Sequence, residues 1–183
     1  MTKAYITNII KTAFQHLSIL LVLMGVCVQV HDGDTISVIH ENKTIRVRLV
    51  SIDSPELGQP YGRSAKNFMT QLCLKENVRV VPLEIDKYRR LVARVYLEDG
   101  RELSREMAAH GYAWYYGRYH EDLNIKALQD NARGARLGLW QEPNPTPPWE
   151  WRKQNSSSQS SSSPNNNHDI LEKQILRLLR GIL

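Results

Sequence analysis

Cysteine is scarce in this chain of 183 residues, which contains two, Cys27 and Cys73. They form no Cys-x-x-Cys pair, and the His and Asp residues around them do not have the spacing of a zinc site. Each cysteine lies at an apolar position of its segment. Two buried free thiols are therefore the favoured interpretation, and a disulfide between them is the alternative.

A hydrophobic run long enough to span a bilayer comfortably is also missing. The apolar stretch from Leu17 to Val28 follows Lys3 and Lys11 and ends before the polar residues that begin at His31. It suits the central region of a secretory signal, although residues 25–27 make a poor cleavage site; a first strand with a hydrophobic lead-in is the alternative. We expect residues 1–24 to be a signal peptide, cleaved near residues 24–26, or a retained membrane anchor. The protein would then be exported to the periplasm or secreted.

Charge of one sign is only in modest excess, with a formal net charge of +5. A polyanion such as nucleic acid is the natural partner to suspect, but many basic proteins bind none. The length allows one domain with a real core and terminal extensions, and the patterns below place this domain at residues 25–153.

The C-terminal part of the chain changes composition twice. Residues 143–151 are rich in proline and aromatic residues, and we expect an extended tail whose tryptophans pack back on the domain. Residues 154–167 are rich in Ser and Asn and poor in apolar residues, which predicts a disordered linker. Residues 168–183 are again amphipathic, and this short tail could dock on a partner, a membrane surface or the chain itself.

Alternation of apolar residues predicts five strands. Two flank a tight Asp-Gly turn at residues 32–33, and a third alternates over residues 45–49. The fourth and fifth cover residues 78–85 and 91–97. Pro82 within the fourth strand indicates an edge or a bulge, because proline cannot donate a hydrogen bond to a neighbouring strand.

Helical spacing predicts three helices. Apolar residues between Ser64 and Cys73 recur at i, i+3, i+4 and i+7; a short helix covers residues 103–110, and a longer one covers residues 121–137. Five short strands with a helix between the third and the fourth suit an α+β fold that is mainly β. We expect a five-stranded Greek-key barrel of the oligonucleotide-binding (OB) type with about three helices.

Three segments carry clustered charges that packing alone rarely requires. The first reads D-G-D-T at residues 32–35, where Asp32 is expected to cap the turn. The second ends a strand with Arg48 and then presents Asp53 and Glu56 on either side of a Ser-Pro break. The third reads D-K-Y-R-R at residues 86–90.

At these residues the chain resembles the staphylococcal-nuclease-like (thermonuclease) family. The matching pattern is D-G-D-T, then R-L-x-x-I-D-S-P-E, then D-K-Y-x-R-L-x-A, followed by A-H-G-Y-A-W and a later G-L-W. The resemblance covers roughly Gly25 to Arg152 and implies the same five-stranded barrel. It also implies a calcium-dependent endonuclease that hydrolyses phosphodiester bonds of DNA and RNA with little sequence specificity, with single strands favoured.

The resemblance implies a calcium site at Asp34, Asp53 and the backbone carbonyl of Ser54. Calcium takes hard oxygen ligands in a flexible shell, so this set leaves room for water and a phosphate oxygen. Glu56 would be the acid that activates water.

The resemblance also implies cationic residues that act on the phosphate. Arg48 and Arg90 would stabilise the transition state, because guanidinium groups match its equatorial oxygens. Lys87 and Tyr88 would contact a neighbouring phosphate. A further tyrosine of this kind would lie among residues 115, 116 and 119.

Two positions depart from the family pattern. Ser54 replaces the commoner threonine, which is harmless if only its carbonyl oxygen is used. Arg89 stands where the family usually has glycine, and it could either perturb the turn or strengthen phosphate binding. The alternative function is a non-catalytic OB-fold module that binds nucleic acid. No obligate protein partner is evident, and membrane association through the N-terminal segment is possible.

Overall fold

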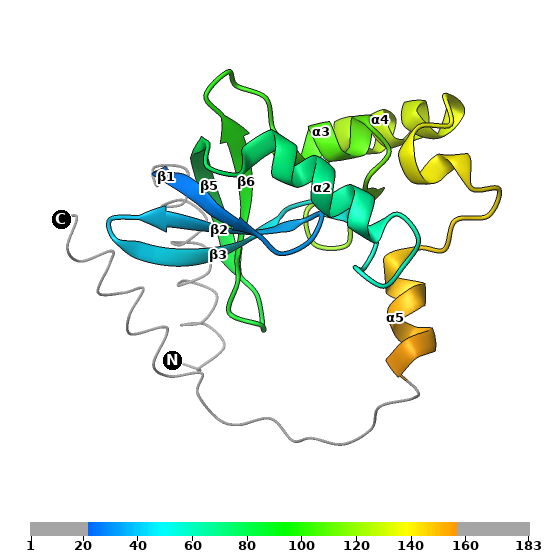
Figure 1. The fold of residues 1–183 in the computed structure, drawn as a ribbon, viewed down its shortest axis with the longest axis horizontal. Coiled ribbons are helices and arrows are strands. Elements are labelled where there is room, and N and C mark those ends of the chain that lie inside the picture. The colour runs from blue at the N-terminus through cyan, green and yellow to red at the C-terminus, as the bar shows by residue number, and fades with distance from the viewer. Residues whose placement is uncertain (1–21, 157–183) are drawn as a thin grey trace, which may run out of the picture. The chain divides into compact units, whose positions relative to one another are not determined.

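The structure, a computed structural model, describes residues 22–156 of the chain. Five strands form a closed barrel in the order β1-β2-β3-β6-β5 (Figure 1). Their bounds are β1 Leu23–Val30, β2 Thr35–His40, β3 Lys43–Leu49, β5 Asn77–Ile85 and β6 Leu91–Leu97. Neighbours are antiparallel except for β3 and β6, which run parallel. The predicted α+β fold with a five-stranded barrel is confirmed.

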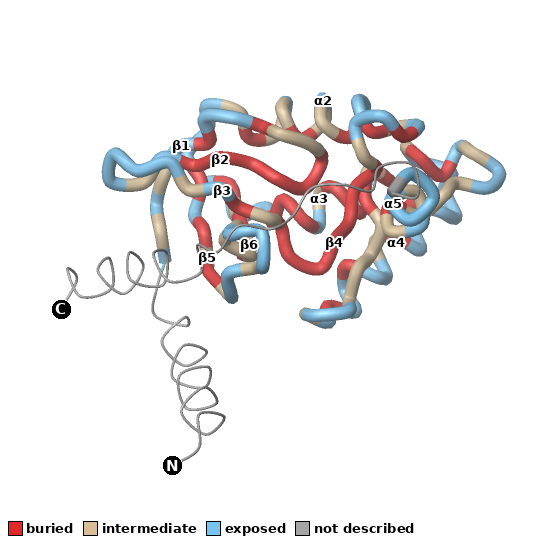
Figure 2. Tube along the Cα trace, turned by 90° about the horizontal axis from the view of Figure 1, so that it is seen from below, coloured by how far each residue is buried: buried red, intermediate tan, exposed pale blue. Residues whose placement is uncertain are grey.

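The barrel interior is filled by the alternate residues of its strands, as the period of two predicts. In β3, Val47 and Leu49 are buried, whereas Arg46 between the strand's apolar positions is exposed. Figure 2 shows one buried stretch along β2 and another in the segment around β4. The strand residues that face outward are therefore available for a site on the barrel's outer surface.

Two strands differ in detail from the sequence prediction. The register of β5 and β6 shifts between Pro82 and Glu84, so the proline lies at a bulge and not at an edge of the closed barrel. Strand β1 begins at Leu23, and residues 23–26 already pair with β5. The predicted start of the domain at residue 25 therefore falls inside this strand. The predicted signal or anchor lies mostly outside the described residues.

Three helices lie close to their predicted positions. They are α2 Gly62–Cys73, α3 Leu103–Ala109 and α4 Leu123–Gly134. Asp122 caps α4, because its side chain accepts hydrogen bonds from the N–H groups of Asn124 and Ile125. Helix α4 ends three residues before the predicted end, and a 3-10 turn, η1, follows at Gly138–Gln141.

The sequence did not predict a short strand pair or a fourth helix. Strand β4 (Ile52–Asp53) pairs with β7 (Trp114–Tyr115), and α5 covers Pro148–Ser156. The expectation of an extended chain through residue 151 is therefore wrong: proline at the first helical position is compatible with a helix, since its missing N–H is not needed there. Trp149 does pack back on the domain, with its ring 5.7 Å from that of Trp114.

The prediction that a disordered linker begins at residue 154 is also wrong, because α5 continues through residues 154–156. The rest of the predicted linker and the amphipathic tail concern residues 157–183, which lie outside the described residues. Within residues 22–156, every helix is too short or too polar to cross a membrane.

Candidate functional site

Arg48 joins two of the predicted site residues. It lies near the end of β3, opposite Thr35 of β2 in the antiparallel register. One nitrogen of its guanidinium group, Nη2, lies 3.1 Å from Oδ2 of Asp34 and 3.2 Å from Oδ1 of Asp53. The side chains of the two aspartates are only 8% and 4% exposed. The buried negative charges are therefore compensated by an arginine that a barrel strand holds in place.

The turn between β1 and β2 positions Asp34. Its backbone N–H donates to Oδ1 of Asp32 at 3.0 Å, so Asp32 caps the turn as expected. Its Oδ2 accepts a hydrogen bond from the N–H of Ser54 at 2.8 Å. A Cβ on Gly33 would lie 2.7 Å from the Ser54 side chain, so this close approach requires glycine. Burial and the nearby negative charge of Asp34 raise the pKa of Asp32 to about 7.

The short β4–β7 pair fixes the next part of the site. Asp53 is opposite Trp114 in this pair, and Ser54 follows directly. The hydroxyl oxygen of Ser54 is buried without a hydrogen-bond partner among the described residues. Two carboxylates and a buried hydroxyl therefore lie next to one another beside Arg48.

Glu56 lies in a tight loop that follows Pro55. Gln59 closes this loop through hydrogen bonds to both the N–H and the carbonyl group of Glu56. The N–H of Glu56 donates to Oε1 of Gln59 at 3.1 Å, and the N–H of Gln59 donates to the carbonyl of Glu56 at 2.8 Å. The side-chain nitrogen of Gln59 donates to the carbonyl of Thr146 at 2.6 Å. Gln59 is buried, and the sequence reasoning assigned it no role.

The turn between β5 and β6 carries the second cationic cluster. Asp86 accepts hydrogen bonds from the backbone N–H groups of Tyr88 and Arg90 at 2.9 and 3.0 Å. It also binds the Arg90 guanidinium group, with contacts of 2.8 Å to Nε and 2.7 Å to Nη2. Arg90 is thus ion-paired with Asp86. Sequence reasoning missed this role of Asp86.

Arg90 directly precedes β6, the parallel neighbour of the strand that carries Arg48. Arg48 is opposite Val92 in the parallel β3–β6 pair, and paired residues of parallel strands point to the same side. Arg90 lies two residues before Val92, in the turn that ends where β6 begins at Leu91. Lys87 and Tyr88 are exposed in the turn, with the lysine ammonium 5.0 Å from the centre of the tyrosine ring.

Arg89 adopts a left-handed backbone conformation, with φ of 66°. Glycine takes this conformation at little cost, whereas other residues are strained in it. The family's usual glycine at this position has a physical reason, and Arg89 occupies the same turn at a cost in stability.

Among the three tyrosines that the sequence left open, Tyr119 is the most accessible. It is 69% exposed, whereas Tyr115 and Tyr116 are partly buried. Its ring lies 6.1 Å from that of Tyr116 and beneath the guanidinium group of Arg118.

The residues around Arg48 fit a hard cation in their chemistry. Within residues 22–156, no group of three or more His, Cys, Asp or Glu side chains is arranged to hold a metal ion. The available donors are the carboxylates of Asp34 and Asp53 with oxygens of Ser54, whose hydroxyl is buried and unpartnered. An all-oxygen set of this kind suits calcium better than zinc or copper.

Comparison with protein families identifies the fold's relatives. The family model described as staphylococcal nuclease homologue matches residues 46–142. The chain belongs to the staphylococcal nuclease family. The match begins at Arg46 and includes Arg48, Asp53, Glu56 and Arg90, whereas Asp34 precedes it. Asp34 is linked to the matched residues by its contacts with Arg48 and Ser54.

Individual relatives are similar over about 70% of this chain. An uncharacterized endonuclease of Escherichia coli is 41% identical over 128 residues, which are 70% of this chain and 84% of the relative. An uncharacterized endonuclease of Haemophilus influenzae is 38% identical over 128 residues, 69% of this chain and 71% of the relative. The micrococcal nuclease of Shigella flexneri is 37% identical over 139 residues, 70% of this chain and 80% of the relative.

Proposed function

We propose that this family member is a calcium-dependent endonuclease that hydrolyses phosphodiester bonds of DNA and RNA with little sequence specificity. The observation that supports this most directly is the contact of Arg48 with both Asp34 and Asp53 at the side of the barrel. Family membership and relatives that are named endonuclease and micrococcal nuclease support the same activity. The proposed residues would act on the phosphates of the nucleic acid. This would explain a lack of sequence preference, since phosphates carry no sequence information.

Glu56 is proposed as the base of the reaction. Its carboxylate takes a proton from water as the water oxygen forms a bond to phosphorus and the bond to the leaving alkoxide oxygen breaks. General base catalysis of this kind contributes about 10²–10⁴ in rate. The position of Glu56 depends on its loop, which Gln59 closes through hydrogen bonds to both backbone groups of Glu56.

Arg48 and Arg90 are proposed to stabilise the charge that develops on the phosphate oxygens. Arg48 lies in β3, and Arg90 directly precedes β6, the parallel neighbour of β3. Loss of one such donor costs on the order of 2.7–4 kcal/mol of transition-state stabilisation at comparable sites. Lys87 and Tyr88 are proposed to contact a neighbouring phosphate, in keeping with their exposure next to Arg90.

Asp34, Asp53 and Ser54 would hold the calcium ion. When bound, a cation at these oxygens supplies a Lewis acid and a template for a phosphate oxygen. In the protein alone, Arg48 compensates the two carboxylates.

The proposal is tested by incubating the purified protein with heat-denatured DNA and with RNA in calcium, in magnesium and in the chelator EGTA. Cleavage is expected in calcium and not in EGTA. A Glu56→Gln variant should lower kcat by about 10²–10⁴, whereas Glu41→Gln, at an exposed turn position, should not. Equal cleavage by wild type and Glu56→Gln in calcium would contradict the proposal.

The alternative is a module of the same fold that binds nucleic acid without cleaving it. Single-stranded DNA that is retarded in a binding gel but stays intact in calcium would favour this alternative. The presence of Asp34, Arg48, Asp53, Glu56 and Arg90 together favours the enzyme, because a binding module needs no acids against a polyanion.

We also propose export of the protein, with possible membrane association through its N-terminal segment. An oxygen-only calcium site suits the millimolar calcium found outside cells. Cell fractionation with a tagged full-length chain tests this, and a signal confined to the cytoplasm would contradict it.

A further inference from the structure

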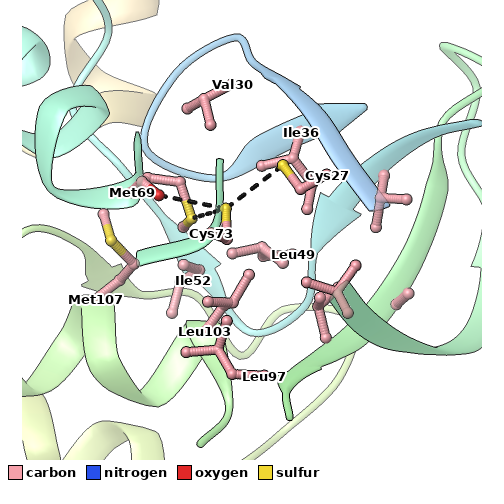
Figure 3. Packing of buried hydrophobic residues seen from close by; sticks show 14 of the residues in the cluster. Cys27, Val30, Ile36, Leu49, Ile52, Met69, Cys73, Leu97, Leu103 and Met107 are labelled. Atoms are coloured by element: carbon pink, nitrogen blue, oxygen red, sulfur yellow. Dashed lines mark hydrogen bonds between the residues drawn. The ribbon is translucent and has the colours of Figure 1, made fainter. Parts of the chain in front are cut away.

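The two cysteines of the chain lie in direct contact in the hydrophobic core, where α2 packs on β1. Cys27 belongs to β1 and Cys73 to the last turn of α2, and both are wholly buried. Their Sγ atoms are 3.6 Å apart although the residues are 46 positions apart in sequence. Figure 3 shows the two sulfurs facing each other among core side chains, with Met69 beside Cys73.

Backbone hydrogen bonds hold the two segments together at this point. The N–H of Cys27 donates to the carbonyl of Glu76 at 3.0 Å, and its carbonyl accepts from the N–H of Lys75 at 2.7 Å. The residues that follow Cys73 are therefore bound directly to Cys27. These backbone bonds keep the end of α2 beside β1, so the two cysteines stay close to each other.

We propose that Cys27 and Cys73 are a disulfide-forming pair that links β1 to α2. The sulfurs must move about 1.5 Å closer to reach the length of a disulfide bond, and rotation of the two side chains supplies much of this movement. The oxidant is a disulfide-bearing molecule such as oxidised glutathione or an oxidised dithiol enzyme. Two S–H bonds are lost and one S–S bond forms, while two electrons and two protons pass to the oxidant and convert its disulfide to two thiols.

The burial of both sulfurs determines when the reaction takes place. An external disulfide cannot reach them in the packed core, so exchange occurs while β1 and α2 are still coming together during folding. One cysteine thiolate attacks the oxidant's disulfide and forms a mixed disulfide, and one half of the oxidant leaves as a thiolate. The second cysteine thiolate then attacks the protein sulfur of the mixed disulfide, and the other half of the oxidant leaves as a thiolate. In the folded pair, a hydrogen bond from Cys73 lowers the pKa of Cys27, whereas the same bond and burial raise the pKa of Cys73.

The link fastens the barrel to the helix that begins beside the Glu56 loop. Gly62, the first residue of α2, packs so closely that a Cβ there would overlap the carbonyl of Glu56. A covalent bond at the other end of α2 closes a loop of 46 residues and restricts the unfolded chain. The inference concerns this pair alone and does not depend on nuclease activity.

The test is to unfold and refold the full-length protein in a buffer of oxidised and reduced glutathione, and in a second buffer with a reductant only. After oxidative refolding we expect no reactive thiol in the denatured chain and a tryptic fragment in which the peptides of Cys27 and Cys73 are joined. The oxidised monomer should melt about 5–10 °C above the reduced one. Subsequent addition of a reductant to the unfolded chain should abolish the difference.

Two single variants serve as controls. Cys27→Val and Cys73→Ala keep apolar side chains in the core, and each should melt at the same temperature in both buffers. The proposal is overturned if oxidatively refolded wild type keeps two thiols per chain or links its cysteines only between chains. It is equally overturned if the linked monomer melts no higher than the reduced protein.

Discussion

Replacement of Gln59 by leucine tests how the Glu56 loop is held. The substitution keeps the approximate volume of the side chain but removes both of its hydrogen bonds. The N–H of Glu56 loses its acceptor at 3.1 Å, and the carbonyl of Thr146 loses its donor at 2.6 Å. The Gln59 side chain is itself buried, at 7% exposed, whereas Glu56 and Thr146 are partly exposed.

The expected loss of stability follows from these two bonds. A buried group that is left without its partner costs about 1–3 kcal/mol, and water can reach the more open Glu56 N–H. We therefore expect Gln59→Leu to lower the free energy of unfolding by about 2–4 kcal/mol in total. Gln71→Leu on the exposed face of α2 is the matched control and should change it by less than about 0.5 kcal/mol.

The same variant should reduce kcat if Glu56 is the base, because displacement of a catalytic group by about 1 Å can cost 10²-fold. Activity on denatured DNA is measured well below the melting temperature, in the wild-type and the Glu56→Gln backgrounds. Gln59→Leu should lower kcat strongly in the first background and little in the second, with KM nearly unchanged in both. A wild-type kcat and an unchanged unfolding free energy would refute the reasoning. An equal loss in both backgrounds would show that Gln59 does not act through Glu56.

Three further predictions concern other parts of the structure. Arg89→Gly should raise the unfolding free energy by about 0.5–1 kcal/mol in denaturant titrations, because φ is 66° at this position; an unchanged or lower value would contradict a strained turn. Burial opposes the charge of Asp122, but hydrogen bonds from Arg94 and Ile125 bring its pKa below the ordinary value of 3.8. Its charge therefore stabilises the fold above that value and ceases to do so as the pH falls through the lowered pKa. Asp122→Asn keeps the cap and should melt lower than wild type at neutral pH, with a gap that closes in acid; a constant gap would contradict this. A chain that starts at Val22 should unfold cooperatively, whereas one that starts at Cys27 lacks the residues of β1 that pair with β5 and should melt lower or not fold.

The sequence predicts the barrel well because its strands alternate clearly. Residues 45–49 and 91–97 show the period of two, and the structure places them side by side in β3 and β6. The strands that contain Asp53 and Trp114 have two residues each, which is too short to show a period in the sequence. Their pairing depends on the folded positions of β3 and α3. Helix α5 was not predicted, because adjacent prolines usually indicate a break in secondary structure. Pro148 is in fact the first residue of this helix.

The sequence named the candidate site residues, and the structure shows which of them lie in contact. The motif around Arg48 indicated which side chains would meet, and Arg48 indeed contacts Asp34 and Asp53. The ion pair of Arg90 with Asp86 and the bond from Gln59 to Thr146 could not be inferred. Gln59 and Thr146 are 87 residues apart, and no local pattern reports a contact over that distance. The contact of Cys27 with Cys73 could not be inferred either, because these residues are 46 positions apart in the sequence.

The three loops of the site share one construction that none of the motifs reveals. In each loop, a side chain within four residues accepts the backbone N–H of a proposed functional residue. Asp32 accepts from Asp34, Gln59 from Glu56, and Asp86 from Arg90, at 3.0, 3.1 and 3.0 Å. Loops without such bonds sample many backbone conformations, and each freely rotating residue costs about 1–2 kcal/mol to order. At the proposed site these acceptors order the loops before a substrate arrives. Substrate binding then bears little of the entropy cost of ordering them, as in a preorganised site. Arg48 needs no such acceptor, since the ladder of β3 already holds it.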